Sequence, residues 1–280
     1  MSFYQGRAYS ILHPTDFSET SEIAFAHALA IAIKNKADLT LLHVEADKHK
    51  EIDWHDFPAI RETLERWGKM EPGSRRSDIS TKLGIQVDKR IAIDSNPVNA
   101  VVELSNVDGF DLLVMGTSGN NNYFIEPPTS LKISQQTRLP SLFIVEGARS
   151  CVDLATGKPS LSKVVLAVDH YPNARPGLAR ICTMVQNLSI EHPEVDLLHV
   201  GNENQFPEID LPMDSEINWS KVSRTGTPST EITSYAEEVN ADLIVMVTSG
   251  QRSLWDMLTG STVQNVLKNA PCPVFTLPVE

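Results

Sequence analysis

The sequence contains only three cysteines, and none of its apolar runs approaches the roughly 20 residues that a helix needs to span a bilayer. Cys151, Cys182 and Cys272 form no CxxC pair, which predicts free thiols in a reducing compartment rather than a disulfide framework. The first dozen residues lack the basic segment, the long apolar stretch and the cleavage site of a secretory signal. These absences predict a cytoplasmic protein without a membrane span.

Basic residues are also scarce. Lysine and arginine together number 24 against 36 aspartates and glutamates, which gives a formal net charge of −12. An acidic surface repels the phosphate backbone unless basic residues cluster, and only short groups such as Arg75-Arg76 are present. We therefore expect no nucleic-acid partner, and we interpret the acidic surplus as a solvated surface.

The sequence repeats itself once. Asp111–Met115 (DLLVM) matches Asp242–Met246 (DLIVM), an offset of 131 residues, and one residue later both copies continue with Thr-Ser-Gly. The same offset pairs Ser130 with Ser261. Between the two copies lies a segment with glycine, proline and serine and little hydrophobic periodicity, as in linkers. We therefore expect a first domain over residues 1–147, a linker over 148–162 and a second domain over 163–280.

Within each copy, short apolar runs alternate with segments of helical periodicity. Near-continuous apolar runs are typical of parallel strands that are buried on both faces. The alternation predicts two α/β domains, each with a five-stranded parallel sheet and helices on both faces. In such sheets, ligands bind beyond the carboxyl ends of the strands.

The second copy is shorter between its second and third predicted strands. The chain advances 53 residues from Val44 to Pro97 but only 28 from Val200 to Pro228. In the first copy this stretch contains a predicted helix over about residues 57–70, whereas the second copy has an acidic segment with two prolines. We expect the second domain to lack this crossover helix, and its exposed sheet face to be covered by the other domain or by another subunit.

A glycine loop follows the fourth predicted strand of each copy. The first copy reads Gly116–Gly119, nine residues, then Thr129-Ser130; the second reads Val247–Gly250, nine residues, then Gly260–Thr262. With the surrounding text, such as ILHPTDFSETSEIA near the start and NAPCPVFTLP near the end, this pattern resembles the universal stress protein family. Nucleotide-binding members of that family carry Gly-x-x-Gly, nine residues, then Gly-Ser or Gly-Thr. The resemblance covers nearly the whole chain and implies an adenine nucleotide alpha hydrolase-like, Rossmann-like fold for both domains.

Each copy has lost one glycine of that loop. The glycines allow positive φ and close approach to phosphates, and the following helix start presents amides and a hydroxyl. In the first copy Thr129 replaces the glycine at the helix start, and Pro127-Pro128 remove two amide donors. In the second copy only the first glycine is lost, to Val247, and Gly260–Thr262 keep the expected helix start. This difference favours phosphate binding in the second domain.

The other end of the site is assigned by the resemblance. In family members that bind ATP, an aspartate after the first strand and the backbone of a valine ending the second strand contact the adenine. These are Asp16 and Val44 in the first copy, and Asp169 and Val200 in the second. Both aspartates are explained equally well as caps of the following helix. Arg252 could reach a phosphate, or could be a solvated arginine.

The resemblance thus implies a stress-response protein that binds ATP, with Mg²⁺, or a related adenine nucleotide as a regulatory ligand, chiefly in the second domain. The expected contacts in that domain are Asp169, Val200, Gly250, Arg252, Gly260, Ser261 and Thr262. The expected contacts in the first domain are Asp16, Val44, Gly116, Gly119 and Ser130. Two alternatives stay open, namely a scaffold with decayed sites that binds proteins, and a slow ATP hydrolase. Family members often dimerise, so we also expect an intramolecular pseudo-dimer of the two domains, alone or within a homodimer.

No catalytic or metal-binding pattern emerges from the residues. There is no Walker loop and no nucleophile with a paired base. His43 and His199 recur at matching positions and suggest a metal site, but no acidic partner lies at ligand spacing, so a structural role is favoured. Cys151 could be an exposed redox thiol, although a single cysteine in a loop usually has no such role.

Overall fold

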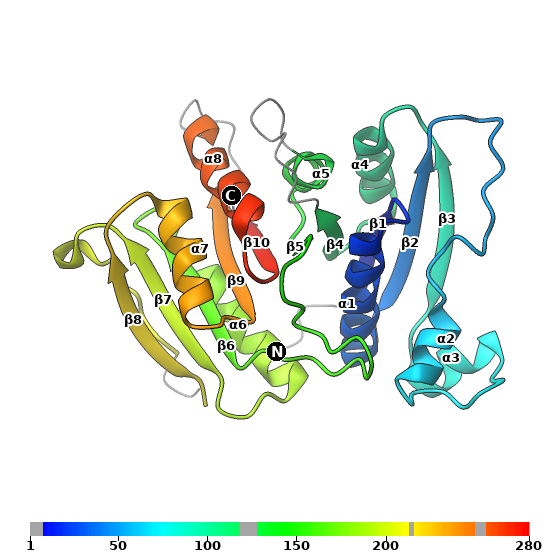
Figure 1. The fold of residues 1–280 in the computed structure, drawn as a ribbon, viewed down its shortest axis with the longest axis horizontal. Helices are drawn as coiled ribbons and strands as arrows, with labels where there is room; N and C mark the ends of the chain where they lie inside the picture. Colours follow the sequence, from blue (N-terminus) through cyan, green and yellow to red (C-terminus); the bar gives the residue numbers. More distant parts are fainter. Residues whose placement is uncertain (1–7, 118–127, 213–215, 250–255, 280) are drawn as a thin grey trace.

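The computed structural model describes residues 8–117, 128–212, 216–249 and 256–279 (Figure 1). Ten strands form one continuous sheet in the order β3-β2-β1-β4-β5-β10-β9-β6-β7-β8. The strands of the first half are β1 (Ser10–Thr15), β2 (Asp38–Glu45), β3 (Val87–Ile93), β4 (Leu112–Thr117) and β5 (Ser141–Val145). Those of the second half are β6 (Lys163–Val168), β7 (Glu194–Val200), β8 (Asn218–Arg224), β9 (Leu243–Ser249) and β10 (Val274–Val279).

The strand order is the same in both halves, with the first strand between the second and the fourth. Neighbouring strands within each half run parallel, which confirms two five-stranded parallel sheets. The halves meet at β5 and β10, which pair antiparallel, with Phe143 opposite Val274. The repeat in the sequence is therefore also a repeat of topology.

Helices cover both faces of the sheet, as expected (Figure 1). They are α1 (Glu19–Asn35), α2 (Ile60–Arg66), α3 (Arg76–Leu83), α4 (Pro97–Asp108), α5 (Thr129–Thr137), α6 (Arg175–Leu188), α7 (Pro228–Glu238) and α8 (Asp256–Asn269). Side chains of α1 and α6 share one core, and those of α4, α5, α7 and α8 share the other. The adjacent residues Ile11 and Leu12 on β1 enter different cores because successive side chains of a strand point to opposite faces.

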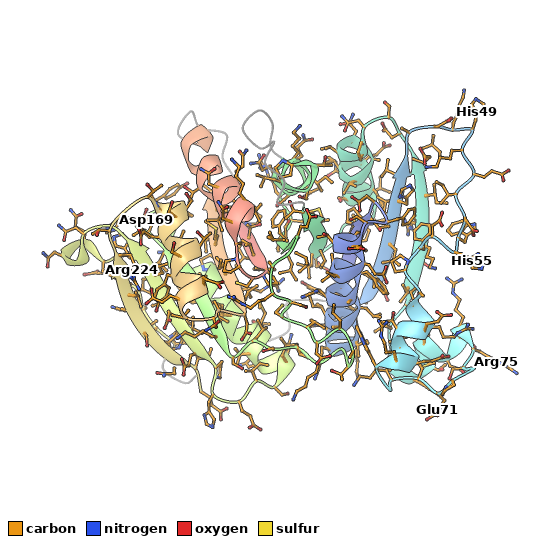
Figure 2. The ribbon with its side chains drawn as sticks, viewed as in Figure 1. His49, His55, Glu71, Arg75, Asp169 and Arg224 are labelled. Carbon is orange, nitrogen blue, oxygen red and sulfur yellow. The ribbon has the colours of Figure 1, made fainter. Side chains whose placement is uncertain are left out.

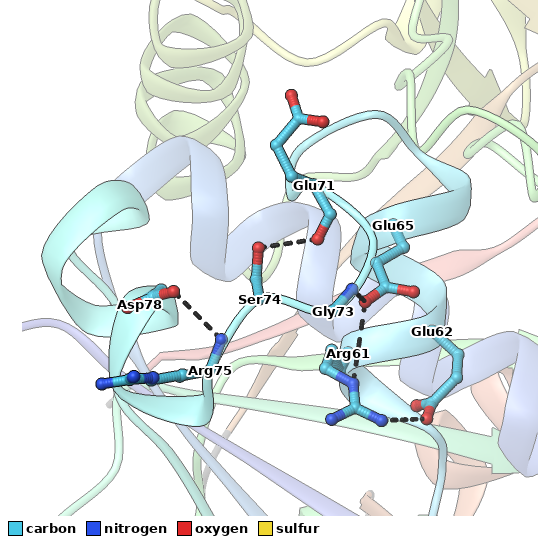
Figure 3. A network of polar contacts seen from close by, with 8 residues as sticks. All are labelled: Arg61, Glu62, Glu65, Glu71, Gly73, Ser74, Arg75 and Asp78. Atoms are coloured by element: carbon cyan, nitrogen blue, oxygen red, sulfur yellow. Dashed lines mark hydrogen bonds and ion pairs between the residues drawn. The ribbon is translucent and has the colours of Figure 1, made fainter.

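The crossover between β2 and β3 contains two short helices where one helix over 57–70 was expected. Helix α2 ends at Arg66, and the chain passes through Gly68 and Gly73, both at positive φ, before α3 begins. Figure 2 places Glu71 and Arg75 of this turn at the outer margin of the first half. Polar contacts close the turn: the Gly73 amide donates to Oε1 of Glu65 at 3.1 Å, as Figure 3 shows.

The equivalent crossover of the second half contains no α-helix in its described residues. Between β7 and β8 the structure describes a single 3₁₀ turn, η1 (Glu203–Gln205), and extended chain, which confirms the loss of the helix. The expected cover from the other domain or another subunit stays a prediction. In the segment between β7 and β8, the side chains of Phe206, Ile209 and Leu211 pack against the core. This segment therefore covers apolar surface in the place where the first half has helices.

The segment over residues 148–162 is packed against the body of the protein. Val152 forms a β-bridge with Pro159, and the indole Nε1 of Trp67 donates to the Leu154 carbonyl oxygen at 3.0 Å. Cys151 is only 6% exposed, and burial raises the pKa of its thiol far above the ordinary value. The alternative of an exposed redox thiol is therefore wrong. Among the described residues, no helix is long and apolar enough to cross a membrane.

Candidate functional site

Asp16 and Asp169 follow the carboxyl ends of β1 and β6, the central strands of the two halves. Asp16 is exposed, and its Oδ1 accepts hydrogen bonds from the amide and the hydroxyl of Ser18 at 3.1 and 2.7 Å. Ser18 is the N-cap of α1 and accepts from the Ser21 amide at 3.2 Å. Asp16 therefore orients the capping residue and is not itself the cap.

Asp169 does not cap a helix either. Its Oδ1 accepts from the amide of the next residue, His170, at 2.8 Å, whereas α6 begins only at Arg175. Asp169 instead lines a hollow of about 400 Å³ beyond the end of β6. His170, Asn173 and Phe206 are among the other residues that line it. The second half thus presents an exposed carboxylate beside a partly aromatic hollow.

A cluster of aromatic rings supports this hollow. The ring of His199 contacts His170 and Phe206 edge-on, with centroid distances of 5.9 and 5.7 Å. His170 Nε2 lies 2.9 Å from the Gln205 carbonyl oxygen, and His199 Nδ1 lies 3.2 Å from that of Val168. These contacts hold the segment after β7 over the strand ends.

The matching histidine of the first half also has a structural role. His43 Nδ1 lies 2.9 Å from the Thr15 carbonyl oxygen, and its ring stacks on Phe17 at a centroid distance of 4.1 Å. The repeated histidines therefore tie the second strand of each half to the end of the first strand. The described residues contain no group of three or more ligands that could hold a metal ion.

The two valines expected at the base lie at the same edge of the sheet. Val44 is the penultimate residue of β2 and pairs in register with Ala92, and Val200 ends β7 opposite Arg224. Both are half-buried. The structure thus brings the aspartate and the valine of each half to the carboxyl ends of neighbouring strands.

At the other end of the first site, Gly116 has a packing role. A Cβ at this position would lie 3.2 Å from backbone atoms of Thr20 and Ser21, so the glycine lets the start of α1 approach β4 closely. Helix α5 begins at Thr129, as expected, and Ser130 is 8% exposed. The Ser130 hydroxyl is buried and has no hydrogen-bond partner within the described residues. Gly119 lies outside them.

In the second half the expected helix start at Gly260 is wrong. Helix α8 begins at Asp256, so Gly260, Ser261 and Thr262 lie inside the helix rather than at its first turn. The physical reason is local: Pro127-Pro128 precede α5 directly, but no proline or glycine stands between positions 251 and 259, so nothing prevents an earlier start. Thr262 is half-buried; Gly250 and Arg252 lie outside the described residues, and so does the side chain of Ser261.

Seven residues that line the hollow together with Asp169 were missed by the sequence reasoning, and they are His170, Asn173, Ala174, Phe206, Pro207, Glu208 and Ile209. One signal was available: Asp169-His170-Tyr171-Pro172 departs from the Asp16-Phe17-Ser18 pattern of the first half. The contribution of Phe206 and Pro207 could not be found in this way because it depends on how the replacing segment folds back over the strand ends.

The fold and the site define a class, namely tandem α/β proteins whose candidate ligand sites lie beyond the carboxyl ends of parallel strands. The universal stress protein family matches residues 9–133 and 214–278 of this chain. The chain belongs to the universal stress protein family. This confirms the resemblance that the glycine loops and the flanking segments indicated.

Individual relatives agree with this assignment. Universal stress protein MJ0531 of Methanocaldococcus jannaschii is 48% identical over 52 residues, 19% of this chain, and the match spans only 31% of that relative. Universal stress protein MJ0577 of the same organism is 30% identical over 129 residues, covering 40% of this chain and 78% of the relative. The structure of a universal stress protein from Archaeoglobus fulgidus covers 96% of both chains, with a TM-score of 0.62 and 21% identity.

Proposed function

We propose that this chain is a stress-response protein of the cytoplasm that binds ATP or a related adenine nucleotide as a regulatory ligand, chiefly in the second half. The observation that carries the proposal is the hollow of about 400 Å³ beside Asp169. It lies beyond the end of the central strand β6, where parallel α/β sheets bind their ligands. Its volume is in the range of about 300–1,000 Å³ of small-molecule sites.

The chemistry of the hollow suits an adenine base. The carboxylate of Asp169 is exposed and can accept a hydrogen bond from the exocyclic amine. Phe206 and His170 offer ring surfaces on the sides of the same hollow, against which a flat base can pack. These residues therefore fit the base end of the ligand. The Mg²⁺-bound phosphates would extend toward the start of α8, where a helix dipole favours negative charge.

Calorimetry with ATP and Mg²⁺ on the full chain tests this proposal. Asp169→Asn removes the carboxylate at the second site, and Asp16→Asn is the matched change at the first. We expect saturable binding that weakens about tenfold or more in Asp169→Asn, the loss expected for a hydrogen bond to a charged group. Asp16→Asn should bind ATP like the wild type. No heat in the wild type, or equal weakening in both variants, would contradict the proposal.

A second candidate function, a protein-binding scaffold with decayed sites, is favoured by one specific observation. Helix α8 begins at Asp256, so the residues at the second family position, Gly260 and Ser261, lie within the helix and not at its amino end. A loop altered in this way would have lost its cradle for phosphates. Nucleotide that remains bound to the chain through purification, identified by mass spectrometry after denaturation, would exclude this alternative.

We also propose that residues 1–147 and 163–280 act as two domains joined as an intramolecular pseudo-dimer. The support is the antiparallel pairing of β5 with β10, which continues the sheet from one half into the other. If β5 and β10 are the dimer-forming edges and already pair with each other, the protein should be a monomer of 31.0 kDa in light scattering. A stable homodimer would show instead that the pairing of the two halves leaves a further interface to be covered.

A further inference from the structure

A second hollow lies between the two halves, at the opposite edge of the sheet from Asp16 and Asp169. Its volume is about 680 Å³. Leu112 and Leu243, the first residues of β4 and β9, line it together with residues from the carboxyl-terminal parts of α1 and α6. It is therefore located at the amino ends of the parallel strands, away from the proposed nucleotide site.

Both halves and the connecting segment build this hollow, which makes it a product of the tandem arrangement. Its sides are largely apolar, with Leu142, Val152, Leu161, Met184 and Leu188 among the lining residues. At its edge the two helices are joined directly, because Asn187 Nδ2 on α6 donates to Asn35 Oδ1 on α1 at 2.7 Å. An apolar hollow of this size has room for the apolar body of a small molecule.

The charge of the hollow is opposite to that of the protein as a whole. Its described lining includes two cations, Lys36 and Arg180, and no aspartate or glutamate, although the chain carries a net charge of −12. Lys36 is exposed, whereas Arg180 is half-buried. This distribution favours a ligand with a negative group.

The guanidinium of Arg180 is held in place but incompletely paired. One terminal nitrogen donates to the Tyr9 hydroxyl at 2.8 Å, and the group lies over the rings of Tyr9 and Phe275 at 5.9 and 5.3 Å. Its Nε is buried and has no hydrogen-bond partner within the described residues. Because the buried Nε is out of reach of a ligand in the hollow, a carboxylate would pair with the terminal nitrogens, whose planar geometry it matches.

We propose that this hollow is a binding site for an amphipathic monocarboxylate, a molecule with one carboxylate and an apolar body. The carboxylate pairs with Arg180, and the body fills the apolar space between α1 and α6. The ligand contacts both halves at once, so binding stabilises the joint between them. This site is separate from the proposed nucleotide site and does not depend on it.

Calorimetry of the full chain with decanoate, below the concentration at which it forms micelles, tests the proposal. We expect saturable binding of one decanoate, and binding of decanol and of acetate at least about tenfold weaker, because each lacks one of the two required features. Equal affinity for decanol and decanoate, or no saturable binding of decanoate, would overturn the proposal. Saturating ATP should leave the affinity for decanoate unchanged. Competition between ATP and decanoate would show that decanoate binds at the nucleotide site, and would overturn the proposal.

Two variants place the ligand in this hollow. Arg180→Met keeps much of the side-chain volume without the charge and should weaken decanoate at least about tenfold but leave decanol unchanged. Arg175→Met, at an exposed position at the start of the same helix, is the matched control and should bind decanoate normally. Thr183→Phe fills the hollow from an exposed position and tests the site even if Arg180→Met fails to fold. Normal decanoate binding by a folded Thr183→Phe would overturn the location.

Discussion

The hydroxyl of Tyr235 on α7 donates a hydrogen bond of 2.8 Å to Oδ2 of Asp196 on β7, where the aspartate is only 3% exposed. The Nζ of Lys163 lies 2.7 Å from the same oxygen. Burial and, to a smaller extent, the hydrogen bond to Asp196 raise the pKa of the Tyr235 phenol far above its ordinary value. The phenol therefore stays protonated and remains a donor. This buried group links the first two strands of the second half to α7.

Removing the shared carboxylate should therefore be expensive. Asp196→Ala leaves the buried phenol of Tyr235 without its partner and the ammonium of Lys163 with only the exposed Glu194, and we expect a loss of about 3–5 kcal/mol in the free energy of unfolding. Glu194→Ala, which removes the exposed partner of Lys163 at 3.0 Å, is the control and should cost at most about 1 kcal/mol. Urea unfolding measures both. Similar losses in the two variants would show that the buried carboxylate of Asp196 stabilises the protein no more than the exposed carboxylate of Glu194.

Gly157 in the connecting segment (residues 148–162) should tolerate substitution less well than Gly147, which directly precedes the segment. Gly157 has φ +68, and a Cβ there would clash with the ring of Trp67, whereas Gly147 has φ +74 and nothing within 4 Å. Gly147→Ala should cost about 1–2 kcal/mol, from backbone strain alone. Gly157→Ala should cost a further 1–3 kcal/mol or so, because the side chain overpacks the indole. Equal urea midpoints for Gly147→Ala and Gly157→Ala would mean that the connecting segment accommodates a side chain at position 157 without loss of stability.

Two buried histidines should make the protein sensitive to acid. Burial lowers the pKa of both His13 and His27 from 6.5 to about 4. The unfolded chain therefore takes up protons near pH 6.5 that the folded chain accepts only near pH 4. Each ring contributes stability above pH 6.5 that is lost as the pH falls towards 4, up to about 3 kcal/mol per ring.

Urea unfolding at several pH values between 7 and 4 checks this dependence. His27→Gln should reduce the slope of stability against pH, because a neutral amide replaces a ring that the folded state keeps unprotonated. His49→Gln removes one histidine from an exposed position of the first half, shown in Figure 2, and serves as the control. An unchanged slope in His27→Gln would show that His27 does not contribute to the pH dependence of stability.

The hydroxyl of Ser130, which has no hydrogen-bond partner within the described residues, predicts a substitution that does not destabilise the protein. Ser105 is equally buried, at 8% exposure, but its hydroxyl donates to the Val101 carbonyl oxygen at 2.7 Å. Ser130→Ala removes an unsatisfied polar atom and should leave the free energy of unfolding unchanged or raise it, whereas Ser105→Ala should cost about 1 kcal/mol. Thermal unfolding of the two variants compares them. A loss in Ser130→Ala larger than in Ser105→Ala would show that its hydroxyl has a partner.

The fold was largely predictable because it rests on local patterns. The repeated DLLVM and DLIVM strands, the apolar runs and the shortened stretch after Val200 together predicted two parallel sheets and the missing helix. The sequence predicted one helix over residues 57–70, whereas the structure has α2 and, after Gly68 and Gly73, α3. The hydrophobic period does not show where the chain turns at these two glycines. The packing of Trp67 on the connecting segment joins residues far apart in the sequence, and no local pattern reports it.

The candidate site was predictable only in part. The resemblance assigned Asp16 and Asp169, and the structure brings each to the carboxyl end of its central strand. The start of α8 was misplaced because the spacing to Gly260 was carried over from the family, whereas the helix can begin at Asp256 where no proline stops it. The hollow beside Asp169 depends on Phe206 folding back, which the composition of its segment does not reveal.

The central claim is that adenine nucleotide binds beside Asp169 in the second half. Native mass spectrometry of the full chain with ATP and Mg²⁺ tests it most directly, because it counts bound nucleotides in one measurement. We predict one bound ATP in the wild type and in Asp16→Asn, and a several-fold smaller fraction of ATP-bound protein in Asp169→Asn at an ATP concentration near the dissociation constant of the wild type. ATP retained by Asp169→Asn but lost from Asp16→Asn, or no bound ATP in any of the three proteins, would contradict the claim.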